Sequence, residues 1–246
     1  MTYDEKSVVV LLKGGRLPSW YNLCEDVQAS HSQLHVELML SVAQEHKMMR
    51  LEGYRLISPM EYWERFWVIE FPSLSGAEAW IQAERAPPYG RYGYYEYHLA
   101  RRSALQTYRA GSGEPDQVSG ERDIDPHRIP ELGVDRDVIV VLNFQRNRAK
   151  TEDAPASTSD YSEDSLCRSD TALSNSILAA ESFELIAPQD NWDTVSIVEL
   201  SQFTDVETWL DRKIELSRAT NRGSSAYLCR KWSPEYFKLW APRSTP

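Results

Sequence analysis

Two side chains with complementary acid–base chemistry lie on strands that the sequence predicts. Glu70 is in the apolar run "RFWVIEF" (residues 65–71), and His98 is in "GYYEYHLARR" (residues 93–102). If the two strands are adjacent and antiparallel, the carboxylate and the imidazole come within reach, and an apolar pocket brings both pKa values toward neutrality. Tyr94 shares a strand face with His98. We therefore predict Glu70 and His98 as a catalytic pair, with Tyr94, Lys13 or Asn143 binding an oxyanion; a structural ion pair is the alternative.

Motifs for metals and nucleotides are absent from the sequence. His31 and His35 are four residues apart on a predicted helix, but no HExxH pattern accompanies them. The glycines of "LLKGGRLPSW" (residues 11–20) follow a strand without a GxGxxG or GxxxxGK[ST] pattern. The three cysteines, Cys24, Cys167 and Cys229, have no paired spacing, and Cys24 and Cys229 are expected to be small buried side chains. We predict no metal and no cofactor.

The elements that carry these residues occur twice. "IEFPSLSGAEAWI" (residues 69–81) aligns without a gap with "VELSQFTDVETWL" (residues 198–210), which pairs Glu70 with Glu199. "SVVVLLK" (residues 7–13) matches "DVIVVLN" (residues 137–143), which pairs Lys13 with Asn143. A match between "GYYEYHLARR" and "SAYLCRKW" (residues 225–232) places Tyr227 on the last strand of the second copy. Glu199, Tyr227 and the strand residue Trp67 join the predicted substrate-binding set, although core packing explains a tryptophan equally well.

Each copy has the pattern strand, helix, strand, strand, helix, strand. In the first copy, a helix within residues 30–47 places Leu34, Leu38 and Val42 on one face. The second helix is predicted to begin at a capping box formed by Ser75 and Glu78, which Thr204 and Glu207 repeat. In the second copy the first helix is expected over residues 170–180.

The sequence therefore divides into three parts. Residues 1–108 form the first repeat, residues 109–136 a linker rich in Gly, Pro and charge, and residues 137–246 the second repeat. The second repeat contains an acidic, Ser-rich insertion at residues 147–170, which is typical of a mobile surface loop.

The order βαββαβ is ferredoxin-like, with an antiparallel sheet and both helices on one face. Strand "RFWVIEF" is apolar on both faces, so the second face of the sheet must also be covered. The chain thus resembles the dimeric α/β-barrel superfamily, which includes antibiotic-biosynthesis monooxygenases, EthD-like proteins and small polyketide cyclases. The resemblance implies an α+β fold in which two fused repeats pack sheet to sheet as an intrachain pseudo-dimeric barrel, with a ligand inside.

The resemblance and the missing motifs together imply a cofactor-independent enzyme of natural-product metabolism. We expect cyclisation, isomerisation or dehydration, including pericyclic ring closure, of a hydrophobic oxygenated small molecule. A cofactor-free monooxygenase and a non-catalytic small-molecule-binding or stress-response barrel protein are the alternatives. Haem-binding relatives also exist, and His98 is the only histidine on a predicted strand that could ligate iron.

Composition bears on partners and location. The net charge of −10 and the absence of a basic stripe argue against nucleic acid as a partner. No apolar run approaches the length of a membrane helix, and the N-terminal residues do not have the order of a signal peptide. We expect a cytoplasmic protein that is a monomer (a pseudo-dimer) or a homodimer.

Overall fold

The structure is a computed structural model that describes residues 7–60, 62–103, 108–109, 138–146, 176–186, 192–220 and 223–232. These residues form two compact units. The first unit includes residues 7–100 and 231–232, and the second includes the described residues between 101 and 230. The predicted acidic insertion and nearly all of the predicted linker lie outside the described residues.

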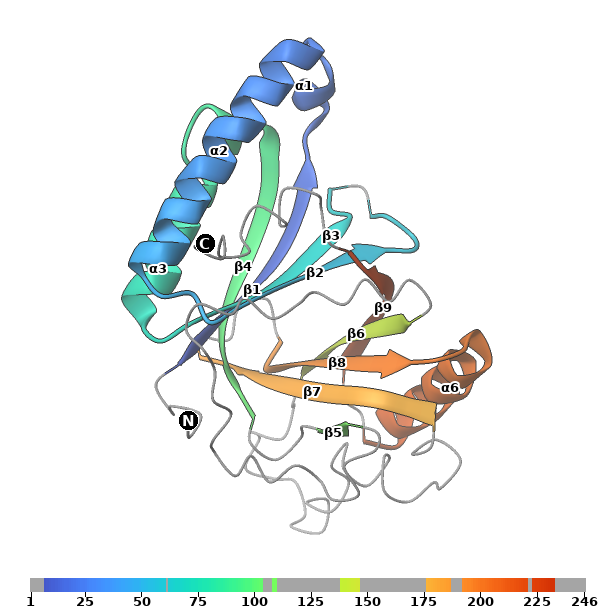
Figure 1. Cartoon of the computed structure of the whole chain (residues 1–246). Helices are drawn as coiled ribbons and strands as arrows, with labels where there is room; N and C mark the ends of the chain where they lie inside the picture. The colour runs from blue at the N-terminus through green and yellow to red at the C-terminus, as the bar shows by residue number, and fades with distance from the viewer. Residues whose placement is uncertain are drawn as a thin grey trace, which may run out of the picture. The chain divides into compact units, whose positions relative to one another are not determined.

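The first unit contains the complete βαββαβ order (Figure 1). Its strands pair antiparallel in the order β4-β1-β3-β2. The elements are β1 (Val8–Arg16), α1 (Pro18–Tyr21), α2 (Glu25–Glu45), β2 (Arg50–Leu56), β3 (Arg65–Phe71), α3 (Leu74–Glu84), the 3-10 helix η1 (Tyr89–Tyr92) and β4 (Gly93–Arg102). The sequence predicted β3 and β4 with these bounds.

One face of this sheet packs against the two long helices, which lie side by side (Figure 1). Val8, Val10 and Leu12 point to that face, because alternate residues of a strand share a side. They meet Met39 of α2 and Trp80 of α3 in a continuous core. Alternation therefore places the odd-numbered residues of β1 on the opposite side, which we call the helix-free face.

The second unit repeats the strand order. Its strands pair antiparallel in the order β9-β6-β8-β7-β5. The elements are β5 (Tyr108–Arg109), β6 (Ile139–Arg146), β7 (Ile177–Leu185), β8 (Thr194–Leu200), α6 (Phe203–Thr220) and β9 (Gly223–Lys231). Val206 and Trp209 of α6 pack on Ile139, Val141 and Leu200, so this sheet also has a helix-covered face.

Two local predictions in the second unit and one in the first are wrong. Residues 177–180, which the sequence assigned to a helix, begin the strand β7. The helix α3 is capped by Ser73, whose Oγ accepts a hydrogen bond from Gly76 N (3.3 Å), rather than by Ser75. The corresponding helix α6 already includes Phe203, so Thr204 is not its cap. In α3 the cap comes two residues earlier because Ser73 is the last extended residue before the helix.

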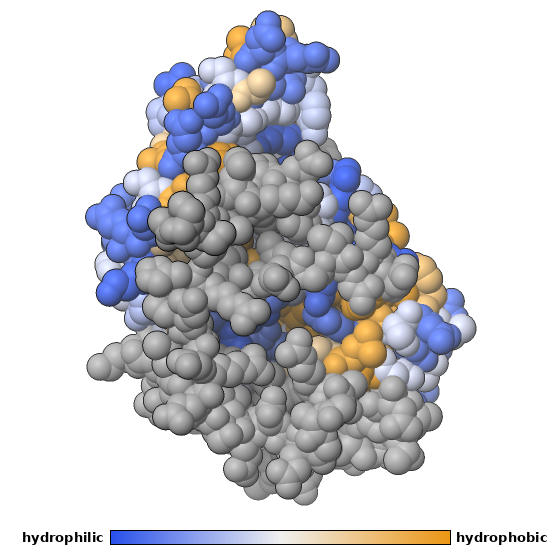
Figure 2. Space-filling model, in the orientation of Figure 1, coloured by the Kyte–Doolittle hydropathy of each residue, from blue (hydrophilic) through white to orange (hydrophobic). Residues whose placement is uncertain are grey.

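The expected apolar stripe of α2 is confirmed only at Val42, which packs against the core between the sheet and the helices. Leu34 and Leu38 are 52% and 39% exposed, whereas Met39 is 2% exposed. Figure 2 shows the surface around α1 and α2 as mostly hydrophilic with separate hydrophobic spots. Single exposed leucines of this kind are ordinary on a folded surface. In the part of the chain that the structure describes, no helix is long and apolar enough to span a membrane.

Candidate functional site

The candidate site lies on the helix-free face of the first sheet. Strand pairing sets Leu11 opposite His98 and Lys13 opposite Glu96. On the other side of β1, Leu11 is opposite Val68 and Lys13 is opposite Phe66. The face therefore combines fully buried apolar residues with a group of ionisable ones, and His98 is only 3% exposed.

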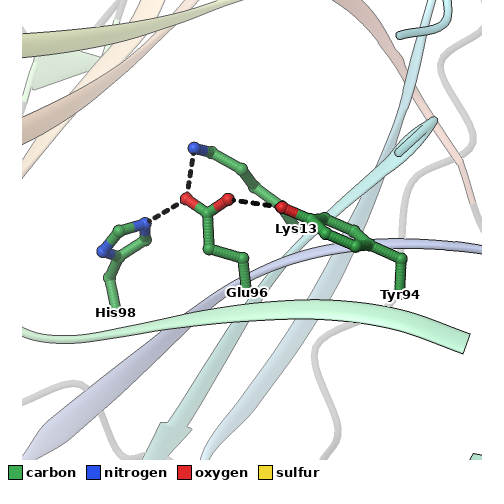
Figure 3. Close-up of polar contacts among 4 residues, drawn as sticks. All are labelled: Lys13, Tyr94, Glu96 and His98. Carbon is green, nitrogen blue, oxygen red and sulfur yellow. Dashed lines mark hydrogen bonds and ion pairs between the residues drawn. The ribbon is translucent and has the colours of Figure 1, made fainter. Parts of the chain in front are cut away.

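Three donors of this face converge on one carboxylate (Figure 3). Lys13 Nζ lies 2.5 Å from Glu96 Oε1, and His98 Nε2 lies 2.8 Å from the same oxygen. Tyr94 donates its hydroxyl proton to Glu96 Oε2 over 2.9 Å. These four residues, Lys13, Tyr94, Glu96 and His98, are called the quartet below.

The quartet keeps Glu96 ionised. The hydrogen bond from His98, followed by those from Lys13 and Tyr94, lowers the pKa of Glu96 from 4.5 to about 2, although burial acts in the opposite direction. An ionised carboxylate only accepts hydrogen bonds. His98 must therefore carry a proton on Nε2, which fixes the orientation and tautomer of the neutral imidazole.

Aromatic side chains stand beside the quartet. Lys13 Nζ lies 5.6 Å from the centroid of the Trp63 ring, and the Tyr62 and Tyr94 rings are 6.0 Å apart. Trp63 is 7% exposed, whereas Tyr62 is 57% exposed. The side chain of Glu96 keeps 25% of its surface accessible, against 1% for His98. The site thus has buried donors and a carboxylate that a molecule from outside can reach.

The expected pairing of Glu70 with His98 across adjacent strands is wrong. Glu70 is on β3 and His98 is on β4, and β1 lies between these strands. Glu70 does lie on the helix-free face, is 2% exposed and accepts a hydrogen bond from Ser7 Oγ over 3.0 Å. The carboxylate next to His98 is Glu96, two residues away on the same strand.

Two other predicted site residues lie on helix-covered faces. Trp67 belongs to the core under α2 and α3, and its ring centroid is 5.0 Å from that of Trp232. Asn143 pairs with Ser196, accepts a hydrogen bond from Ser224 Oγ over 2.8 Å and is fully buried. It follows Ile139 and Val141 on the side that α6 covers. Asn143 therefore does not correspond to Lys13, because a shift of one residue moves a side chain to the other face of a sheet.

The remaining two predicted residues lie on the helix-free face of the second sheet. Glu199 is opposite Val140, and Tyr227 is opposite Leu142. The Tyr227 ring meets that of Phe144 edge to face, with centroids 5.7 Å apart. Of the predicted residues, the structure brings together Lys13, Tyr94 and His98, and it places Glu199 and Tyr227 in the other unit.

Sequence reasoning missed Glu96 and a second carboxylate, Glu52. Burial alone would raise the pKa of Glu52, but Arg50 and Tyr54 outweigh it and lower the pKa to about 2. Arg50 Nη2 is 2.6 Å from Glu52 Oε2. Alternation along each strand was the available signal, since Glu96 shares a face with His98 and Glu52 with Arg50. Among the described residues, no group of three or more His, Cys, Asp or Glu side chains is arranged to hold a metal ion.

No protein-family model and no curated protein sequence matches the chain. Solved structures do match it over nearly the whole length. Chlorite dismutase from Candidatus Nitrospira defluvii aligns over 97% of this chain and 96% of its own, with a TM-score of 0.62 and 13% sequence identity. The same enzyme in complex with imidazole gives a TM-score of 0.54. A haem-binding protein from Thermus thermophilus aligns over 96% of this chain and 95% of its own, with a TM-score of 0.57 and 10% identity.

The fold is chlorite dismutase-like. This confirms the α+β, ferredoxin-like type of fold that the repeat predicted. The subfamilies named from the sequence, such as the EthD-like proteins and antibiotic-biosynthesis monooxygenases, stay predictions.

The expected function is wrong. A cofactor-independent cyclase, isomerase or dehydratase of natural-product metabolism does not agree with neighbours of this fold that are chlorite dismutases and a haem-binding protein. The two alternatives, a cofactor-free monooxygenase and a non-catalytic binding or stress-response barrel, do not agree with them either. The reasoning failed because it relied on missing motifs. Haem iron needs one axial side chain, which leaves no spaced motif in a sequence.

Proposed function

We propose that this chain binds haem, with His98 as the side chain that would hold the iron and Glu96 as the hydrogen-bond partner of its imidazole. The observation that carries the proposal is the bond between His98 Nε2 and the ionised Glu96. Histidines that bind metals commonly donate their other ring N–H to a carboxylate, which fixes the ring and raises the basicity of the ligand. The haem-binding protein from Thermus thermophilus, which has this fold, supports the choice of ligand.

The donor set of the described residues fits one haem ligand better than others. Haem iron accepts His, Cys, Met or Tyr side chains. His35 stacks on Tyr89 with ring centroids 3.9 Å apart, and His31 stacks on Tyr92, so both imidazoles are packed against aromatic rings. Burial raises the pKa of the Cys229 thiol, which opposes the thiolate that iron requires. His35 also has a carboxylate neighbour, Glu84 Oε1 at 3.5 Å, but on a helix. His98 has its carboxylate partner on a strand face that also holds apolar side chains.

The chain's own residues have defined roles in this proposal. Glu96 holds the proton on His98 Nε2, so the buried Nδ1 of the same ring is the nitrogen that would hold the iron. Lys13 and Tyr94 orient the carboxylate and keep it ionised. Leu11 and Val68, both fully buried, supply an apolar floor that excludes water. Haem, when bound, supplies one-electron chemistry and reactions of bound oxygen species.

Titration of the purified chain with hemin tests the proposal. We expect a saturable Soret band with one haem per chain, its loss in His98→Ala and its partial recovery when imidazole is added to that variant. His46→Ala, at the C-terminal end of α2, is the matched control and should bind like the wild type. The absence of a Soret band in the wild type, or unchanged affinity in His98→Ala, would contradict haem binding through His98.

We also propose, from the sequence, that the two sheets pack face to face and that the protein is a cytoplasmic monomer or homodimer. The roles that the sequence predicted for Glu70, Trp67, Asn143, Glu199 and Tyr227 stay predictions and are not part of the haem site proposed here. An alanine variant at each of these positions, measured in the hemin titration above, tests whether the residue contributes to haem affinity. Light scattering during size-exclusion chromatography gives the oligomeric state.

A further inference from the structure

The two repeats provide an internal comparison of every strand position. In the first unit Val8 is opposite Phe71, and in the second Ile139 is opposite Leu200, with all four residues in the helix-side cores. Val8 therefore corresponds to Ile139 and Phe71 to Leu200. The offset is 131 residues between β1 and β6 (139 − 8) and 129 residues between β3 and β8 (200 − 71). The pairing of Val10 with Leu99 and of Val141 with Leu228 extends the offset of 129 to β4 and β9.

With this correspondence, none of the quartet residues is repeated. Lys13 and Glu96 are opposite each other in the first unit, and Phe144 and Ser225 occupy their places in the second. His98 corresponds to Tyr227, which lies opposite Leu142. The remaining member, Tyr94, corresponds to Gly223.

Two other carboxylates of the same face are repeated. Glu70 corresponds to Glu199, and both lie opposite a valine of the first strand. Glu52 corresponds to Glu181, and each has an arginine partner: Arg50 at 2.6 Å from Glu52 and Arg102 at 3.0 Å from Glu181. These acidic positions recur, and so do apolar residues of the same face, since Val9 corresponds to Val140 and Leu11 to Leu142. Recurrence is expected of side chains that the shared fold uses.

The quartet, in contrast, contributes little to the stability of the fold for the charges that it buries. Lys13 and Glu96 form an ion pair whose lysine side chain is 8% exposed, and taking charges out of water costs free energy that the pair only partly recovers. At the positions of Lys13 and His98, the second unit has Phe144 and Tyr227, whose rings pack edge to face. Well-packed apolar residues in place of a buried ion pair are often neutral or stabilising.

We infer that the ligand site of this chain lies in the first repeat alone, that it is built by Lys13, Tyr94, Glu96 and His98, and that the fold itself does not need these four side chains. The identity of the ligand rests on the proposed haem function. The assignment of some side chains to the ligand site and of others to the fold does not depend on haem, because it follows from the comparison of the repeats.

Exchange of quartet residues for their counterparts tests the inference without the ligand. The triple variant Lys13→Phe, Glu96→Ser and His98→Tyr places in the first repeat what the second repeat carries at the same positions. We expect its apo form to unfold within about 2 °C of the wild type or at a higher temperature, because the second repeat already packs these residues at the same positions. A shift of about 2 °C corresponds to a small change in stability for a chain of this length. The triple variant should also lose hemin binding.

The repeated carboxylates are the matched controls. Glu52→Gln and Glu181→Gln each remove a charge from a carboxylate–arginine pair, one in each unit. We expect both to lower the melting temperature, and both to keep one haem per chain. His98→Tyr alone provides a single change in case the triple variant does not fold.

The outcomes separate the two proposals. A triple variant and a His98→Tyr variant that both melt further below the wild type than Glu52→Gln would overturn the inference, as would two haems per chain. Retained stability in the triple variant, with no hemin binding by the wild type, would support the division of roles and contradict the haem proposal.

Discussion

At the scale of single residues, Glu96 illustrates how neighbouring donors control a partly accessible carboxylate. Its hydrogen bonds to His98, Lys13 and Tyr94 lower its pKa even though burial favours the neutral form. The sequence contained the signal for this group, because Tyr94, Glu96 and His98 alternate on one strand. Glu70 was predicted instead because β3 and β4 were taken to be adjacent strands. In a ferredoxin-like sheet the first strand separates them, and the strand order alone excludes that assumption.

The depressed pKa of Glu96 has a consequence for acid stability. A carboxyl whose pKa is about 2 in the folded state and 4.5 ordinarily contributes stability above pH 4.5, which is lost as the pH falls from 4.5 toward 2. Glu96→Gln should therefore lose less stability than the wild type over this interval. Glu52 also has a lowered pKa and is present in both proteins, so their difference reports Glu96.

Urea midpoints measured between pH 2.5 and pH 7 check this prediction. The exposed Glu78 of α3 provides the control variant Glu78→Gln, which should follow the wild type. Parallel pH curves for the wild type and Glu96→Gln would mean that the quartet does not hold the carboxylate in its ionised form.

At the scale of elements, the sequence predicted strands better than helix faces. Strand β3 is recognisable from one continuous apolar, β-branched and aromatic run. Leu34 and Leu38 of α2 were wrongly assigned to the buried stripe together with Val42. They are spaced four residues apart, but so are Met39 and Ala43, which pack against the core beside Val42. The spacing of apolar residues predicts a helix, but it does not show which of two apolar stripes packs against the sheet. The match of Asn143 with Lys13 was wrong for a related reason. An alignment shifted by one residue still predicts the strand but assigns its side chains to the opposite faces.

Two strand glycines of the first unit should respond differently to the same substitution. A Cβ added to Gly53 of β2 would lie 2.2 Å from the Trp67 ring and 2.6 Å from the backbone oxygen of Trp232. A Cβ added to Gly14 of β1 would have its nearest neighbour at 3.8 Å, an ordinary contact. We expect Gly53→Ala to lower the free energy of unfolding by about 1–3 kcal/mol through overpacking, and Gly14→Ala to change it by less than about 1 kcal/mol.

Chemical denaturation of the two glycine variants measures this difference. The positions share a sheet and a substitution, so the cost of replacing glycine in the unfolded chain is common to both. Equal losses in the two variants would show that the close approach of Trp67 to Gly53 does not limit the packing of β2.

At the scale of the whole molecule, duplication explains both what the sequence revealed and what it concealed. Repetition exposed the element order and the type of fold, because the same pattern of strands and helices had to be satisfied twice. It also directed attention to repeated side chains, such as Glu70 with Glu199. A site that evolved in one copy appears as a departure from the repeat, and the structure had to supply the register before that departure became visible.

A site in one repeat predicts an uneven response of the chain to its ligand. Hydrogen exchange slows where binding opposes local opening, and ligand contacts in the first unit should affect its own strands first. We expect hemin to slow exchange in peptides from β1 and β4 more than in those from β6 and β9, the corresponding strands of the second unit. Exchange detected by mass spectrometry, with and without hemin, measures all four strands in one experiment. The His98→Ala variant should show no such difference, and equal slowing of β6 and β9 in the wild type would place the ligand site in both repeats.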